Sequence, residues 1–550
     1  MLENTYNIFF GQFPELTEIQ QLVIPKIDDG DNILVVSSTA SGKTEAVIAP
    51  VCEKLICEDV NKDQLLVVYI IPTIALANDL VIRVKEKIEK SGFSVGIRTS
   101  DDRNFNLKNP QNFLFTTPES LDYLICRFPN LLKKLRYVII DELHFLDNSY
   151  RGDQLRILLE RIKDNLEKDN VSICAMSATI NEPEKMIKRY MKNGQICKTE
   201  GNRNITFIKI DTRKYENYLE HIRKVCDKYF INHQKFLIFC NTKKEVIQLI
   251  SELKNTYHDK QLGIFEHHAS LSRQERKNVE DNLQRNSFGI CVCTNTLELG
   301  IDIGDIDAVM LKNPPPTISS MLQRVGRSNR RTKNSICICI YDNDEDESIF
   351  SDLIGNSIKG NIEKIQYIPD ISVTIQQILS MAYQNHYNYE EFLLTKEKIL
   401  ELLKPFNLRN EIILKIINWL KNEKLFLKIQ RKGDLELILP DTELLNIIER
   451  DPRRIHSNIP DNFLDIPVYD QNNKLIGNIS PPTQNMHSFN LGSKKWEIVS
   501  IENKKINVKQ VEKSGGIPSF YYNKFGYFKK FLPDEIKENI KSGDMFMKLE

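Results

Sequence analysis

The sequence predicts an α/β protein with two parallel-sheet domains, followed by a helical region and a small β-rich region. Short apolar runs alternate with helical periodicity twice within the first 345 or so residues, which implies parallel sheets covered on both faces. From about residue 373 the pattern changes to successive helices and one hairpin, and from about residue 455 to short strands separated by turns.

Each α/β set provides five candidate strands, and we assign residues 1–205 to the first domain and 206–345 to the second. The acidic run Asp342–Glu347 is expected to be a solvated loop that closes the second domain. The expected strands are 33–37, 67–71, 112–117, 137–141 and 172–176 in the first domain, and 235–240, 263–268, 289–294, 308–312 and 335–341 in the second.

Residues 346–445 are expected to form a winged-helix domain. Ile375, Ile378, Leu379 and Ala382 have the spacing of an amphipathic helix. Two further helical runs, 389–403 and 409–424, precede a hairpin that turns at Gly433, and three helices with a hairpin are typical of a helix-turn-helix variant. A plain helical spacer is the alternative.

Residues 446–550 are expected to form a small β-rich domain that ends in an exposed helix from about residue 533. Its expected strands are 466–470, 474–480, 488–492, 495–501 and 506–512.

Composition excludes several classes of protein. No run of 18 apolar residues is present, which predicts no membrane span, and the N-terminus lacks the regions of a signal peptide, so we expect a cytoplasmic location. The 75 basic residues balance 75 acidic ones, so any basic surface must be local. The eleven cysteines include no CxxC pair, which favours reduced, buried thiols over disulfides or a metal site.

The stretch Ser37-Ser38-Thr39-Ala40-Ser41-Gly42-Lys43-Thr44 follows an apolar strand-like run and opens a helical pattern. This is the phosphate-binding arrangement of nucleotide hydrolases, although Ser37 stands where the motif usually has its first glycine. Backbone N–H groups at the loop and helix N-terminus would face phosphates, Lys43 would supply a charge, and Thr44 would supply a hydroxyl for Mg²⁺. The expected nucleotide-binding residues are Thr39, Ala40, Ser41, Gly42, Lys43 and Thr44.

An acidic pair, Asp141-Glu142, follows the expected strand 137–141, at the sheet edge where open α/β sheets bind ligands. Asp141 would hold Mg²⁺, directly or through water, and Glu142 would polarise the attacking water. Ser177-Ala178-Thr179 follows another buried strand, where small hydroxyl residues can relay between the nucleotide and a bound strand.

Residues 321–333 carry four arginines and one lysine with no acid. By itself this run is a basic loop that could contact RNA. Opposite a phosphate loop, spaced arginines such as Arg327 and Arg330 also suggest arginine fingers, which stabilise charge on a transferring phosphoryl group.

In this order, the motifs resemble those of superfamily 2 DExH helicases, most closely the large helicase-related (Lhr) family. The resemblance is weaker in 373–440, at 458–461 and at 491–496; the chain ends soon afterwards, so we expect a shortened Lhr-type protein. The motifs are Thr17-Glu18-Ile19-Gln20, the loop 37–44, Pro72–Asp79, Thr116–Leu121, Asp141-Glu142-Leu143-His144 with Arg151-Gly152, His267–Ser272, Leu297–Gly304 and Gln323–Arg330.

The resemblance implies two tandem RecA-like domains, a winged helix and a β-rich fourth domain. It implies that Gln20 reads adenine and that Gln323, Arg327 and Arg330 complete an ATP site that also includes Gly300 and Asp302. It further implies contacts with a nucleic-acid backbone from Pro72, Thr73, Thr117, Pro118 and Thr294. Ala40 and Asn329 replace glycines common in the family, and asparagine tolerates a left-handed backbone.

The function implied by the resemblance is an ATP- and Mg²⁺-dependent helicase that moves 3′→5′ on single-stranded DNA and unwinds DNA duplexes or RNA–DNA hybrids. The expected partner is a single-stranded or tailed nucleic acid, with DNA favoured and no membrane. Two alternatives stay open: an RNA helicase or remodeller, and an ATP-switched nucleic-acid-binding subunit of a larger complex that does not unwind.

Overall fold

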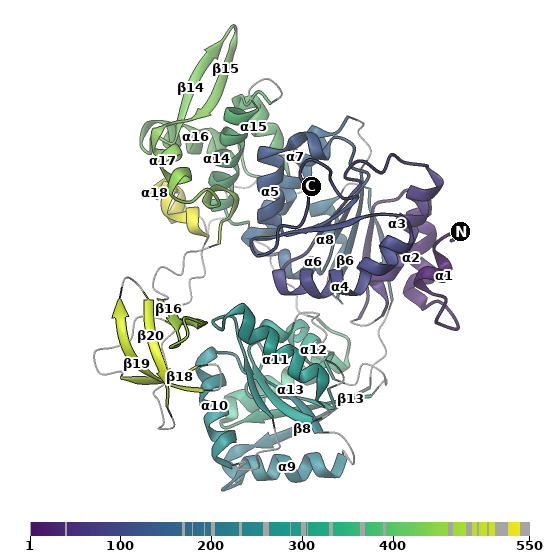
Figure 1. The fold of residues 1–550 in the computed structure, drawn as a ribbon, viewed down its shortest axis with the longest axis vertical. Coiled ribbons are helices and arrows are strands. Elements are labelled where there is room, and N and C mark those ends of the chain that lie inside the picture. The colour runs from purple at the N-terminus through teal and green to yellow at the C-terminus, as the bar shows by residue number, and fades with distance from the viewer. Residues whose placement is uncertain are drawn as a thin grey trace.

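The computed structural model shows two α/β units, a helical module beside the first and a small sheet beside the second (Figure 1). It describes residues 2–38, 41–167, 171–178, 180–191, 193–199, 204–229, 234–256, 263–286, 288–298, 304, 306–328, 334–362, 369–388, 392–459, 466–479, 487–491, 494–502, 505–511 and 526–539.

The first unit is a seven-stranded parallel sheet in the order β3-β4-β2-β5-β6-β1-β7. The five strands expected from sequence are confirmed, and the two edge strands β3 and β7 were missed because they lack a continuous apolar run. The strands are β1 (Ile33–Val36), β2 (Val67–Ile70), β3 (Val95–Arg98), β4 (Phe113–Thr116), β5 (Tyr137–Ile140), β6 (Ser172–Ser177) and β7 (Gln195–Lys198).

Helices cover both faces of this sheet, because successive strand residues point to opposite sides. In β1, Val35 packs with α2 (Glu18–Asp28), α3 (Lys43–Cys57) and α4 (Ile74–Lys90). Its neighbour Leu34 packs on the other side with α5 (Pro118–Arg127), α7 (Tyr150–Asn165) and α8 (Pro183–Tyr190).

The second unit is a six-stranded parallel sheet in the order β10-β11-β9-β12-β13-β8. All five expected strands are present, and β8 is an additional edge strand. The strands are β8 (Asn204–Asp211), β9 (Gln234–Phe239), β10 (Ile264–His267), β11 (Phe288–Cys293), β12 (Ala308–Leu311) and β13 (Asn334–Tyr341); the helices are α9 (Tyr218–Tyr229), α10 (Lys243–Thr256), α11 (Arg273–Arg285), α12 (Ile318–Val325) and α13 (Asp344–Ile358).

The acidic run at 342–347 is not the expected loop. It begins α13, whose N-cap Asn343 accepts a hydrogen bond from the Asp346 backbone N–H at 2.8 Å. Four acidic residues in the first turn lie where the helix dipole favours negative charge, which explains why this sequence is helical.

The helical module contains α14 (Ser372–Tyr387), α15 (Lys396–Leu402), α16 (Asn410–Asn422), the hairpin β14 (Leu427–Lys432) and β15 (Leu435–Pro440), and α17 (Thr442–Arg450). Three helices followed by a hairpin are the order predicted for a winged helix. The predicted amphipathic character of α14 is wrong, since every residue from Ser372 to Asn385 is buried. The reason is that α14 packs against its own module and also against α5 and α7 of the first unit.

A buried ion pair fastens α14 to the first unit. Arg161 of α7 donates to Asp122 of α5 at 2.9 Å, and the same guanidinium donates to Gln377 and Gln384 of α14 at 3.0 and 2.7 Å. Burial by itself would raise the pKa of Asp122, but the Arg161 charge and hydrogen bonds from His456 and Ser380 hold it well below its usual range. The first unit and the helical module therefore form one packed body.

The small sheet has the strand order β17-β16-β20-β19-β18 and rests on the second unit. Leu271 packs in the core of this sheet and forms a bridge with Gly477, and the Ser272 N–H donates to the Ile476 carbonyl at 2.8 Å. Its strands are β16 (Ile466–Tyr469), β17 (Leu475–Ile479), β18 (Ser488–Leu491), β19 (Lys494–Glu502) and β20 (Lys505–Gln510).

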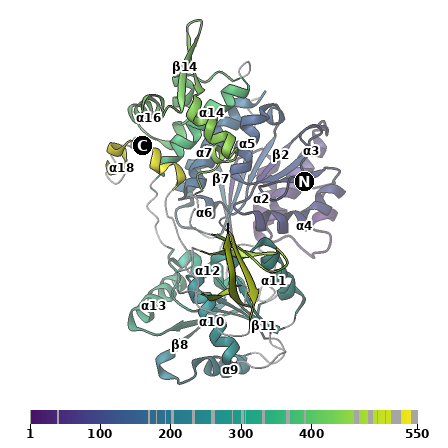
Figure 2. The ribbon, with the colours of Figure 1, turned by 60° about the vertical axis from the view of Figure 1, so that its left-hand side comes forward.

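The segment 526–539 returns to the helical module instead of joining the small sheet (Figures 1 and 2). It contains η6 (Tyr527–Phe531) and α18 (Asp534–Asn539). The Trp419 indole N–H donates to the Phe531 carbonyl at 2.9 Å, and Lys415 pairs with Glu535 at 2.8 Å. Residues 540–550, which were expected to be helical, lie outside the described residues.

The composition led us to expect no membrane span and reduced, buried cysteines. None of the helices in the described residues is long and apolar enough to cross a membrane. The ten cysteines described are all unpaired, and nine of them are buried.

Replacing Asp122 by alanine should cost about 3–5 kcal/mol in the free energy of unfolding, because Arg161 would remain buried without its counter-charge. Since the pKa of Asp122 is lowered by folding, its contribution is present above the unfolded pKa of about 4 and is lost as the pH falls. Urea unfolding of wild type and variant should therefore differ strongly at pH 7 and less at pH 3. The control is Glu167→Ala, which removes an exposed ion pair worth less than about 1 kcal/mol. Equal urea midpoints for the two variants at pH 7 would contradict the assignment.

Replacing Gly477 by valine should detach the small sheet from the second unit. A Cβ at this position would meet the Ser270 carbonyl oxygen at 2.2 Å, and the backbone of both segments prevents relief. We expect faster amide hydrogen exchange in 270–272 and 475–479 with unchanged exchange in the first sheet. Gly355→Val, at a glycine with no atom within 4 Å of an added Cβ, serves as the control. Unchanged exchange at 270–272 would show that the contact is not needed for docking.

Candidate functional site

The phosphate-loop sequence forms the predicted strand–loop–helix junction. Gly42 caps α3 with φ of +85°, a conformation that favours glycine. The buried Lys43 ammonium donates to the carbonyls of Ser37 and Ser38 at 2.6 and 3.1 Å. Burial lowers the pKa of Lys43, and the nearby Glu142 and Asp141 carboxylates oppose that shift. The Lys43 side chain therefore folds back onto the phosphate loop that precedes it.

Gln20 and Thr17 contact this loop directly. Thr17 donates its hydroxyl to the Ser41 carbonyl at 3.0 Å, and the Gln20 amide nitrogen lies 3.4 Å from the Gly42 carbonyl. The other end of Gln20 accepts from the Thr17 backbone N–H at 2.9 Å, which completes a capping box for α2. The adenine-reading role predicted for Gln20 stays a prediction; what the structure adds is that this motif supports the loop.

Asp141 and Glu142 lie at the carboxyl end of β5, beside the phosphate loop. Asp141 accepts from the Tyr69 hydroxyl at 3.0 Å and from the Glu142 N–H at 2.9 Å, and Glu142 has a left-handed backbone with φ of +43°. Burial and the neighbouring Glu142 carboxylate raise the pKa of Asp141. Burial also opposes ionisation of Glu142, but interactions with His144, Lys43 and Arg327 lower its pKa.

His144 connects the acidic pair to the segment Ser177-Ala178. Its Nδ1 atom lies 3.5 Å from the Glu142 carboxylate, and it accepts from the Ala178 N–H at 3.2 Å, which indicates that the ring proton is on Nε2. Burial lowers the pKa of His144 to about 4, so the ring is neutral at pH 7. Sequence reasoning missed this link, although His144 stands in the same tetrapeptide as the acidic pair.

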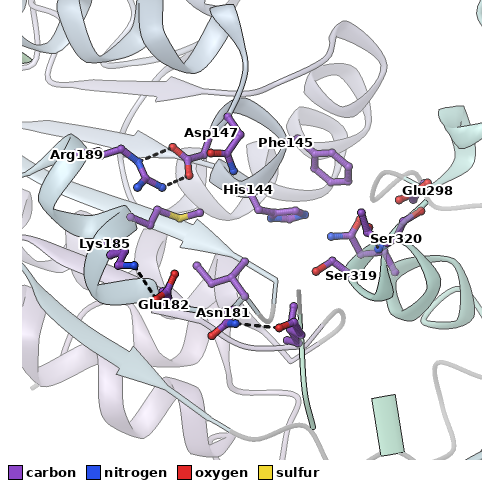
Figure 3. A pocket seen from close by; sticks show the side chains of 16 residues that line it. His144, Phe145, Asp147, Asn181, Glu182, Lys185, Arg189, Glu298, Ser319 and Ser320 are labelled. Atoms are coloured by element: carbon purple, nitrogen blue, oxygen red, sulfur yellow. Dashed lines mark hydrogen bonds and ion pairs between the residues drawn. The ribbon is translucent and has the colours of Figure 1, made fainter. Parts of the chain in front are cut away.

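A cavity of about 220 Å³ separates His144 from the second unit (Figure 3). On its far side lie Glu298 and Ser320 of the second unit, which line the cavity. The buried His144 Nε2 atom has no hydrogen-bond partner among the described residues. The cavity is therefore a polar junction between the two sheets.

The second unit contributes Gln323 and Arg327 near α12. Both are buried, and Arg327 donates to the Glu298 carbonyl. The Arg327 charge acts on both Lys43 and Glu142, so this arginine faces the phosphate loop. Arg324, between them in sequence, instead pairs with Glu298 at 3.2 Å and stacks over Phe239, which is a structural position.

Several predicted site residues lie outside the described residues, so nothing is added to their prediction. They are Thr39, Ala40, Gly300, Asp302 and Arg330.

Four of the five residues predicted to contact nucleic acid lie together at the carboxyl edge of the first sheet. Pro72, Thr73 and Thr117 surround one groove, and Pro118 is the first residue of α5. Arg151 holds this edge together, since it pairs with Glu119 at 2.6 Å and donates to the Pro72 carbonyl. Thr294 is in the second unit, at the end of β11, where its N–H donates to the His267 carbonyl at 3.2 Å.

Two families match the chain. Residues 17–187 match the DEAD/DEAH box helicase family, and residues 219–332 match the helicase conserved C-terminal domain. Each match covers one of the two parallel sheets, apart from the strands at 195–198, 204–211 and 334–341.

Curated proteins that are similar in sequence to this chain are also named as helicases. The chain is 32% identical over 422 residues to the ATP-dependent helicase Lhr-Core of Methanocaldococcus jannaschii, which covers 70% of this chain and 48% of the relative. It is 28% identical over 570 residues to the Lhr-Core helicase of Sulfolobus acidocaldarius, which covers 93% of this chain and 62% of the relative. The chain spans about half to two thirds of the length of the curated relatives it matches.

Solved structures show the same fold. Mycobacterium smegmatis helicase Lhr, solved with ssDNA and AMP-PNP, superposes with a TM-score of 0.70 at 23% identity, covering 84% of this chain and 62% of that one. The DUF1998 helicase MrfA, solved with DNA and AMPPNP, gives 0.73 at 18% identity, covering 93% and 72%. With its motifs, its two matched families and this fold, the chain belongs to the superfamily 2 helicases and is of the Lhr type.

Proposed function

We propose that this protein is a nucleic-acid-dependent ATPase that translocates along a single strand and separates duplexes. The observation that carries the proposal is the junction between the two sheets. There Lys43, the Asp141–Glu142 pair and Arg327, which come from both units, act on one another electrostatically. A nucleotide held at this junction would connect the two units.

The residues present fit a magnesium nucleotide. Two adjacent carboxylates, buried Asp141 and half-buried Glu142, face the ammonium of Lys43, and the inaccessible Glu142 Oε2 and Ser41 Oγ atoms have no hydrogen-bond partner among the described residues. Phosphates would accept from Ser41 and Lys43, and the hydroxyl of Thr44 and the carboxylate of Asp141 would hold Mg²⁺. Bound there, the cation would neutralise charge on the phosphates.

No group of three or more His, Cys, Asp or Glu residues in the described chain could hold a metal by itself. This agrees with Mg²⁺, which keeps several waters and binds through one or two carboxylates together with the phosphates of its substrate.

Glu142 is our candidate for the group that orients the attacking water, because its left-handed backbone holds the carboxylate at the loop-facing end of β5. Neutral His144 would keep Glu142 in place and would transmit its position to Ser177 and Ala178. Arg327 and the predicted Arg330 would stabilise charge on the transferring phosphoryl group from the second unit.

We infer four units with the approximate bounds 1–205, 206–345, 346–445 and 446–550, and two moving bodies. The helical module is fastened to the first unit through Asp122 and Arg161, whereas the small sheet is docked on the second through Gly477. Closure of the nucleotide cleft would therefore carry the small sheet toward the helical module. A strand held between the two bodies would be gripped differently in the open and closed states.

Single-stranded DNA with 3′→5′ movement is the form of this activity that we propose, with DNA duplexes or RNA–DNA hybrids as substrates. Support comes from the curated Lhr-Core relatives, which are named ATP-dependent helicases, and from the fold shared with structures that contain ssDNA or DNA. An RNA helicase and an ATP-switched nucleic-acid-binding subunit that does not unwind are the competing functions.

ATPase assays with DNA, RNA and hybrid strands, beside unwinding assays on tailed duplexes, test the proposal. Turnover that no strand stimulates would contradict it.

Glu142→Gln should keep ATP binding and lose turnover by roughly a hundredfold or more, since the amide cannot accept a proton from water. Fluorescent-nucleotide binding and steady-state ATPase at saturating strand measure the two properties separately. Glu86→Gln, which changes an exposed carboxylate on α4 that pairs with Lys90, is the matched control. Turnover of Glu142→Gln within a few-fold of wild type would rule out its assigned role.

Arg327→Ala should lower turnover at saturating strand by on the order of a thousandfold if the arginine acts as a finger. Arg327→Lys should recover little of this loss, because lysine keeps the charge but not the planar fork. If residues 321–333 are only a basic nucleic-acid contact, strand affinity will instead become weaker and more salt-sensitive while turnover at saturating strand stays unchanged.

A further inference from the structure

Tyr69 of β2 has one of the largest fully buried side chains among the described residues. In the sequence it stands within the apolar run Val67–Ile71, where the pattern predicts only a core position. Its ring stacks on Phe115 of β4, with the ring centres 4.7 Å apart and the planes at 21°. The ring is apolar, but a hydroxyl buried at such a place needs a hydrogen-bond partner.

The partner of this hydroxyl is the carboxylate of Asp141, to which it donates at 3.0 Å. Tyr69 is in register with Ile139 of β5, and Asp141, two residues further along, lies on the same side of the sheet. The Asp141 N–H donates to the Ile70 carbonyl at 2.8 Å, so the backbone ladder between β2 and β5 continues as far as Asp141. The contact is therefore set by the register of two neighbouring strands.

The Asp141 carboxylate has a second donor. The Glu142 N–H donates to Asp141 Oδ1 at 2.9 Å, while the Tyr69 hydroxyl donates to Oδ2. The last torsion of an aspartate side chain has only broad preferences, so a single donor would leave the carboxylate able to turn. Two donors on different oxygens fix its plane. Each carboxylate oxygen has more than one acceptor site, so both keep room for a further ligand.

The orientation of Asp141 matters because few protein groups are available to the proposed Mg²⁺. The described residues contain no group of three or more His, Cys, Asp or Glu that could hold a metal, so the proposed site relies on Asp141 and the Thr44 hydroxyl. Mg²⁺ requires nearly ideal octahedral geometry at short distances. Removing a hydrogen-bond partner of a metal ligand typically lowers metal affinity about 10- to 100-fold for this reason.

We propose that Tyr69 is a positioning residue for the magnesium site. Its hydroxyl holds the Asp141 carboxylate in the orientation that accepts the cation of a bound magnesium nucleotide, and it acts only through Asp141. The inference rests on the magnesium nucleotide site of the proposed function and adds to it a core residue outside the helicase motifs. The alternative is that the hydroxyl is only a satisfied polar group of the core.

Tyr69→Phe removes the hydroxyl and keeps the ring that stacks on Phe115. Tyr190→Phe is the matched control, because the Tyr190 hydroxyl donates at 3.1 Å to Asp147, another buried aspartate of the first unit. Asp147 pairs with Arg189 and has no part in the proposed cation site. Each variant removes one buried hydrogen bond to a carboxylate, so thermal melting without nucleotide should show similar, small losses of stability.

The test uses the full chain and a fluorescent analogue of AMP-PNP. Nucleotide binding is measured over a range of free Mg²⁺ concentrations, and steady-state ATPase is measured over the same range at saturating strand. For Tyr69→Phe we expect the Mg²⁺ concentration that gives half of the gain in nucleotide affinity to rise about 10- to 100-fold, and the concentration for half-maximal turnover to rise with it. Turnover at saturating Mg²⁺ should return to within a few-fold of wild type. Tyr190→Phe should match wild type in both measurements.

Three outcomes would overturn the inference and leave the proposed function intact. The first is an unchanged Mg²⁺ dependence of Tyr69→Phe when wild type requires Mg²⁺. The second is an equal shift in Tyr190→Phe, which would show a general effect of losing a buried hydrogen bond. The third is loss of turnover at every Mg²⁺ concentration with normal Mg²⁺-dependent nucleotide binding, since the hydroxyl would then act on the reaction and not on cation binding.

Failure of the proposed function is seen separately. If no strand stimulates the ATPase of wild type, the proposed function fails, while the binding titration still tests the role of Tyr69. If Mg²⁺ does not change nucleotide binding by wild type, the inference fails whether or not a strand stimulates turnover.

Discussion

The ion pair between Asp122 and Arg161 is the contact on which the arrangement of the molecule depends. Both side chains are fully buried, and the side-chain oxygens of Gln377 and Gln384 also accept hydrogen bonds from the guanidinium. A buried charge pair contributes little net stability compared with apolar packing, but removing one partner is costly. Its effect is therefore on geometry: α14 can dock on the first sheet only where these polar groups meet.

Because of this contact the chain forms two bodies, and each body combines segments that are not consecutive in the sequence. The helical module, which comes third, belongs with the first sheet, and the small sheet that follows belongs with the second. The segment 526–539 then crosses back to the helical module. Any movement between the two bodies would consequently move the small sheet relative to the helical module.

The charged groups at the nucleotide cleft also come from both bodies. The first sheet contributes two carboxylates and one ammonium to the cleft, and the second sheet contributes the positive charge of Arg327. A change in the distance between the two units would therefore change the charge balance at Glu142. His144, neutral because it is buried, connects this balance to Ser177 without adding charge of its own.

Much of this protein was determined by local sequence. The strand-forming runs, the phosphate loop and the acidic pair at the end of β5 were predictable, because a strand, a tight turn and a helix N-terminus each depend on a few adjacent residues. Edge strands such as β7 were missed, since a strand at the sheet edge needs no continuous apolar run.

Only the tertiary structure decided what packs against what. The burial of α14 on all sides, the docking of Gly477 on Leu271 and the groove that Arg98 and Arg453 both line involve residues far apart in the chain. Side-chain spacing on one helix or strand reports that a face is apolar or charged, but not which partner covers it. That choice depends on complementary shape and on the pairing of buried polar groups across the interface, which no single stretch of sequence contains.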